Sequence, residues 1–120
     1  MPSRERVESL VEYATTGRIV EAMEEFYAEN VSMQENGNTP TVGLAANIER
    51  EKAFVDMVGE WHGAGVDALA VDGDTAFLHW FMDFTTKDGH RVKSDQVAWQ
   101  KWDGDKIVWE KFFYDTAKSG

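Results

Sequence analysis

The 120-residue chain contains no cysteine. A disulfide scaffold, a thiol nucleophile and a cysteine-ligated zinc site are therefore excluded. The chain also lacks an apolar run long enough to cross a membrane, and its first residues lead into an amphipathic pattern without the apolar segment of a signal peptide. We therefore expect a soluble, cytoplasmic protein with no membrane partner.

A basic patch is absent as well. The 12 lysines and arginines are scattered among 22 aspartates and glutamates, which gives a formal charge of −10. A chain of this charge repels polyanions, so we expect no nucleic-acid partner.

The sequence also shows no metal or phosphate signature. The three histidines, His62, His79 and His90, do not have the spacing of a metal triad. There is no glycine-rich phosphate loop, and no serine or threonine lies in a nucleophile elbow. We expect no metal and no cofactor.

The chain has enough apolar residues for one core. With 42% hydrophobic and 12% aromatic residues, a chain of this length predicts a single domain over residues 1–120. Helical stripes predict a first helix after an N-cap at Ser3 that ends at residues 15–17, and a second directly after it. A short strand over 30–36 and a turn precede a third helix, which is expected from Gly43 to about Trp61.

The second half of the chain indicates a meander of four strands. The pairs Asp72-Gly73, Asp88-Gly89 and Asp103-Gly104 each separate two runs of strand-forming residues, which is a strong hairpin signal. The expected strands cover about 65–71, 75–86, 90–102 and 106–114. The order α-α-β-α-β-β-β-β predicts an α+β fold, in which three helices cover one face of a strongly curved antiparallel sheet and leave a conical hollow.

Two stretches carry a family resemblance: FYAENVSMQENGNTPTVG, in which a helix ends in an aromatic pair before a strand and a proline-containing loop, and WDGDKIVWEKFFYD, the final hairpin. With this element order they resemble the NTF2-like superfamily, and more narrowly its SnoaL-like branch, which includes polyketide cyclases and is related to ketosteroid isomerases. The resemblance implies a cone-shaped α+β barrel. It is compatible with enzymes, ligand binders and association modules.

A register estimate predicts which face of the sheet meets a ligand. Folding about Asp88-Gly89 would place Met82 near Asp95 and Trp80 near Val97, and the last hairpin would set Trp99 beside Trp109. Aromatic and polar groups would then converge as in a pocket for a small hydrophobic molecule. The expected substrate-binding residues are Trp80, Trp99, Trp109, Phe113, Tyr27 and His79.

Two carboxylates of this face are candidate proton-transfer groups, because an aromatic environment raises a carboxyl pKa toward neutrality. Asp115 matches the acidic residue that closes the last strand in many SnoaL-like chains; alternatively, it caps the strand or pairs with Lys93. Asp95 lies inside a strand; it either enters the pocket, or points outward or pairs with a lysine. His79 is either a hydrogen-bonded sheet histidine or a general acid or base.

Glu35 is a third candidate, through the resemblance. In ketosteroid isomerases the catalytic base lies on the short strand before the proline-containing loop, and Glu35 occupies that neighbourhood; alternatively, it is an exposed strand-end residue. The other two isomerase positions fall on Ala98 and near Leu10, so the resemblance does not extend to the steroid reaction itself.

Two function classes follow. One is a cofactor-independent isomerase, cyclase or dehydratase that uses carboxylate proton transfer on a hydrophobic carbonyl substrate. The other is a non-catalytic ligand-binding or dimeric association module. The face expected opposite the tryptophans carries Phe77, Phe81, Val108, Phe112 and Tyr114, and such an exposed apolar face predicts a homodimer formed through the sheets.

Overall fold

The computed structural model describes residues 1–116. Helix α1 covers Arg4–Thr15, and the Ser3 hydroxyl oxygen accepts the Arg6 N–H at 3.0 Å, as expected of an N-cap. Gly17, at φ +79°, turns the chain into α2, Ile19–Phe26. Both helices begin and end close to the predicted positions.

The next segment differs from the prediction at the start of its first strand, which was expected at residue 30, and at one helix end. Strand β1 covers Tyr27–Glu35, β2 covers Thr41–Val42 and α3 covers Leu44–Met57. We predicted that α3 would continue to about Trp61, which is wrong. From Val58 the backbone pairs with β4, and those tertiary hydrogen bonds override the helical pattern of the apolar residues.

The four predicted meander strands are present. They are β3, Val58–Asp72; β4, Thr75–Thr86; β5, Arg91–Asp103; and β6, Lys106–Phe113. Each predicted turn has its glycine in the left-handed region, with φ between +60° and +95° at Gly73, Gly89 and Gly104.

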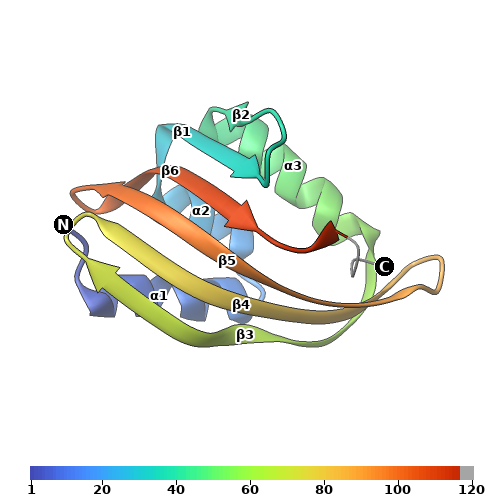
Figure 1. Cartoon of the computed structure of the whole chain (residues 1–120). Coiled ribbons are helices and arrows are strands. Elements are labelled where there is room, and N and C mark those ends of the chain that lie inside the picture. The colour runs from blue at the N-terminus through green and yellow to red at the C-terminus, as the bar shows by residue number, and fades with distance from the viewer. Residues whose placement is uncertain (117–120) are drawn as a thin grey trace.

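The strands form one open sheet in the order β2-β1-β6-β5-β4-β3, with the helices on one face (Figure 1). The α+β class is as predicted, and the element order differs only by the two-residue strand β2, which was not expected between β1 and α3. The sheet is mixed, however, because β1 pairs with β6 in parallel, whereas the other neighbouring strands pair antiparallel. A long crossover separates β1 from β6, so this pairing has no local signal in the sequence.

The predicted register was wrong. Met82 pairs with Ser94 and Trp80 pairs with Gln96, each one residue from the expected partner. A slip of one residue exchanges the two faces of β4 relative to β5. In the last hairpin Trp99 lies opposite Lys111, because an irregularity between Lys101 and Trp102 shifts the pairing.

The core lies between the helices and the covered face of the sheet, which we call the inner face. Its most deeply buried large apolar side chains come from α1, α2, β1, β4 and β6: Leu10, Val7, Met23, Phe26, Val31, Leu78 and Ile107. No helix in residues 1–116 has the length and apolarity needed to span a bilayer.

The fully buried Asn47 joins α3 to β2. Its Nδ2 donates to the carbonyl oxygens of Thr41 at 3.0 Å and Gly43 at 2.8 Å. We expect Asn47→Ala to lower the free energy of unfolding by about 2 kcal/mol, because two partly buried carbonyl groups lose a donor and the buried amide leaves a gap. Denaturant unfolding measures the change, with Asn38→Ala at an exposed position in the loop before β2 as the control. Equal stability of the two variants would contradict this role.

Candidate functional site

A cavity of about 630 Å³ lies between the helices and the inner face of the sheet. Helices α1, α2 and α3 and strands β1, β3, β4, β5 and β6 all contribute to its wall. The aromatic residues in the wall are Tyr27, Phe54, Trp61, Trp80 and Phe112. The polar side chains include Glu110, Glu51, Gln96 and His62, and no lysine or arginine lines the cavity in residues 1–116.

Glu110, on β6, is the most deeply buried of these polar residues, at 1% exposure. The Tyr27 hydroxyl donates to its Oε1 at 2.5 Å, and Gln100 Nε2 donates to its Oε2 at 2.8 Å. The Trp102 indole N–H donates to Gln100 Oε1 at 3.1 Å. An indole nitrogen can only donate, so it turns the Gln100 amide with its NH₂ toward Glu110.

Burial raises the pKa of Glu110 from 4.5 to about 7. The hydrogen bonds from Tyr27 and Gln100 act in the opposite direction, and the charge of Glu51 raises the pKa further. Burial and the neighbouring Glu110 also raise the pKa of Tyr27 well above its usual value. Glu110 can therefore gain or lose a proton near neutral pH while Tyr27 remains a hydroxyl.

Glu51, on α3, is the second carboxyl in the cavity wall. Burial raises its pKa, the neighbouring Arg50 lowers it and Glu35 raises it. The Arg50 guanidinium is bonded to Glu35, whose other oxygen accepts the Tyr114 hydroxyl at 2.8 Å. Glu51 makes no hydrogen bond within residues 1–116.

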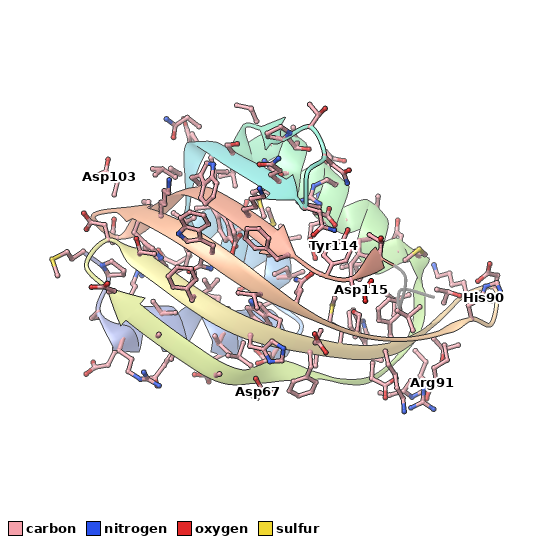
Figure 2. The ribbon with its side chains drawn as sticks, viewed as in Figure 1. Asp67, His90, Arg91, Asp103, Tyr114 and Asp115 are labelled. Carbon is pink, nitrogen blue, oxygen red and sulfur yellow. The ribbon has the colours of Figure 1, made fainter. Side chains whose placement is uncertain are left out.

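The structure places five of the predicted residues on the opposite face of the sheet, which we call the outer face. Asp95, His79, Trp99, Trp109 and Phe113 lie there, and none of them lines the cavity. His79 Nδ1 is 2.6 Å from the carboxylate of Asp67, on the lower strand in Figure 2, and its Nε2 is 3.6 Å from Asp95. Hydrogen bonding to Asp67 raises the pKa of His79.

The other predicted residues lie elsewhere. Tyr27 and Trp80 both line the cavity, on β1 and β4. Glu35 ends β1, where it contacts Arg50 and Tyr114 outside the cavity wall. Asp115 is exposed just beyond the end of β6 (Figure 2). Catalysis by Asp115, Asp95 or Glu35 stays a prediction.

Sequence reasoning missed Glu110, Gln100 and Glu51. Glu110 and Phe112 alternate with Trp109 and Lys111 along β6, so a correct assignment of the inner face would have identified Glu110. The contact with Tyr27, 83 residues away, has no comparable signal.

Residues 1–116 contain no group of three His, Asp or Glu side chains placed to hold a metal ion. What the cavity does contain is a buried carboxyl, a tyrosine hydroxyl and aromatic walls. A family model described as a SnoaL-like domain matches residues 1–114. The chain belongs to the SnoaL-like family. It has no match among curated proteins.

Solved structures share the fold of this SnoaL-like chain. A protein from Mesorhizobium loti, provisionally named a SnoaL-like polyketide cyclase, is 26% identical over 95% of this chain and 100% of its own, with a TM-score of 0.79. A provisionally named isomerase from Rhodopseudomonas palustris is 14% identical over 99% and 93% of the two chains, with a TM-score of 0.79. A Catenulispora acidiphila protein with a ketosteroid isomerase-like fold, solved with trimethylamine, is 12% identical over 98% and 91%, with a TM-score of 0.81.

The raised pKa of Glu110 predicts a pH-dependent stability. The folded chain holds this proton up to about pH 7, whereas the unfolded chain releases it near pH 4.5. The free energy of unfolding therefore falls as pH rises between these values, by roughly 3 kcal/mol from this group, and the fall ends above pH 7. Glu110→Gln lacks this contribution.

Denaturant unfolding of the wild type and Glu110→Gln from pH 4.5 to 8 measures the difference. We expect the stability of the wild type to decline relative to that of the variant as pH rises, since all other titrating groups are common to both. Parallel profiles would show that Glu110 titrates at its ordinary pKa in the folded chain.

Proposed function

We propose that this SnoaL-like chain binds a small hydrophobic molecule in the cavity and that Glu110 exchanges a proton with it. The observation that carries the proposal is a buried carboxyl with a pKa of about 7 in the wall of an aromatic cavity. A group that titrates near the working pH can accept a proton and return it at similar cost. The substrate class that suits this chemistry is a carbonyl compound with an acidic neighbouring C–H bond.

In this mechanism the ionised Glu110 removes the proton from the carbon next to the carbonyl group. The electron pair of that C–H bond forms the carbon–carbon double bond of an enolate, while the π pair of the carbonyl group moves onto its oxygen. The proton then returns from Glu110 to carbon as the carbonyl group forms again. Gln96 lines the cavity and makes no side-chain hydrogen bond within residues 1–116, so its NH₂ is available to donate to the enolate oxygen. An isomerase, cyclase or dehydratase can begin with this step, and none requires a cofactor for it.

A homodimer through the outer face is a second part of the proposal. Phe77, Phe81, Val97 and Phe113 are each about 40% exposed there, and Trp99 packs between Phe77 and Phe113. In Figure 1 the outer face is the one turned toward the viewer, with no helix over it. A second copy suits this surface because Lys93, Lys101 and Lys111 also lie on it and offset the repulsion between two acidic chains.

Deuterium exchange into 2-tetralone tests the proton transfer. We expect the wild type to accelerate exchange at the carbon between the carbonyl and the ring, followed by NMR, and Glu110→Gln to lose about 100-fold or more of that rate. Glu29→Gln is the matched control, because Glu29 is an exposed residue of β1. A loss in Asp95→Asn, Asp115→Asn or Glu35→Gln, with Glu110→Gln active, would assign the base to one of those residues instead. Binding without acceleration by the wild type would identify a non-catalytic ligand-binding module.

Sedimentation velocity tests the homodimer. We expect the wild type to sediment as a dimer at micromolar concentration and Phe77→Glu to sediment as a monomer. Phe77 is 42% exposed in the single chain, so a glutamate there stays hydrated in the monomer, whereas the dimer would bury its charge against an apolar surface. Val42→Glu, at 68% exposure on β2, is the control and should stay dimeric. A wild type that sediments as a monomer would contradict the proposed homodimer.

A further inference from the structure

The ionisable side chains of the cavity wall include carboxyl groups but no lysine or arginine within residues 1–116. The two carboxyl groups are those of Glu51, from α3, and Glu110, from β6. The two lie near enough to each other that the charge of Glu51 raises the pKa of Glu110. The cation next to Glu51 in the chain, Arg50, is bonded to Glu35 outside the cavity wall. Arg50 lowers the pKa of Glu51 and its partner Glu35 raises it, so the two members of this ion pair act on Glu51 in opposite directions, and the carboxyl groups of the cavity wall itself are negative.

Glu110 and Glu51 differ in their hydrogen bonding. Both oxygens of Glu110 already accept hydrogen bonds, from Tyr27 and Gln100. Glu51 accepts none within residues 1–116, although burial has removed part of its hydration. A half-buried carboxylate without a donor is costly to the folded protein, and the positive charge of a cationic ligand offsets that cost.

Aromatic side chains surround the same region. Phe54 is three residues after Glu51 on α3, so both lie on the same side of the helix and both line the cavity. The Phe54 and Trp61 rings meet edge to face, with centroids 6.2 Å apart. Aromatic faces attract cations, and the attraction is greatest where water is displaced. Carboxylate and ring faces together select an organic cation over a neutral molecule of the same shape.

We infer that the ligand of this cavity carries a cationic nitrogen, as a protonated or quaternary amine on a hydrophobic body, and that Glu51 and its aromatic neighbours bind that nitrogen. The inference rests on the proposed function, since it names the class of molecule that the same cavity takes. The two carboxyl groups then have different roles. Glu51 binds the positive charge of the ligand, and Glu110 exchanges the proton.

A pair of isosteric probes tests the inference. Phenyltrimethylammonium and tert-butylbenzene have the same shape and differ in the central atom, a cationic nitrogen or a neutral carbon. We expect ligand-observed NMR titration to give the cation at least tenfold higher affinity for the wild type. Glu51→Gln should remove most of that preference while it leaves the affinity for tert-butylbenzene unchanged.

Glu49→Gln is the matched control. It removes the same charge from α3, but Glu49 is exposed, pairs with Lys52 at 3.8 Å and does not line the cavity. It should keep the full preference for the cation, which separates a local effect of Glu51 from the net charge of the chain. If Glu49→Gln loses as much preference as Glu51→Gln, the attraction is general and the inference is overturned.

The remaining outcomes separate this inference from the proposed function. Equal affinity of the wild type for the two probes would overturn the cationic ligand and leave ligand binding in the cavity intact. Binding of neither probe, together with no exchange into 2-tetralone, would overturn both. Because Glu51→Gln removes a half-buried charge, we expect this variant to fold at least as stably as the wild type.

Discussion

The site depends on β1 lying parallel against β6. In the chain β1 follows α2 and precedes β2 and α3, so its hydrogen bonds to β6 hold the helical layer against the far end of the meander. The same pairing brings the first residue of β1, Tyr27, to Glu110. Without that register the carboxyl would lose the hydroxyl that opposes the effect of burial on its pKa, and the cavity would lose one wall.

Local chemistry predicted most of the fold. The helix start at Ser3 and the three Asp-Gly turns are specified by a few adjacent residues, and they lie where the sequence indicated. The end of α3 was missed because residues 58–61 contain apolar side chains that suit either a helix or a strand. These residues form a strand because they pair with β4, in which Thr86, the partner of Val58, is 28 residues further along the chain.

The site was less predictable than the fold because it depends on register. The difference between Trp80 pairing with Val97 and with Gln96 is one residue, yet it decides that Asp95 lies on the outer face and that Trp80 lines the cavity. The family resemblance identified the fold and the SnoaL-like family correctly. It drew attention to acidic residues near strand ends and away from Glu110, which lies inside β6.

Trp102 does not line the cavity, yet its hydrogen bond determines which oxygen of Glu110 carries the acid proton. The Trp102 N–H fixes the Gln100 amide so that the Gln100 NH₂ faces Oε2 of Glu110. A proton on Oε2 would place two hydrogen-bond donors against each other. The proton therefore resides on Oε1, where the Tyr27 hydroxyl can reverse from donor to acceptor. An indole in the core thus restricts the proposed proton exchange to the Oε1 side of the carboxyl group.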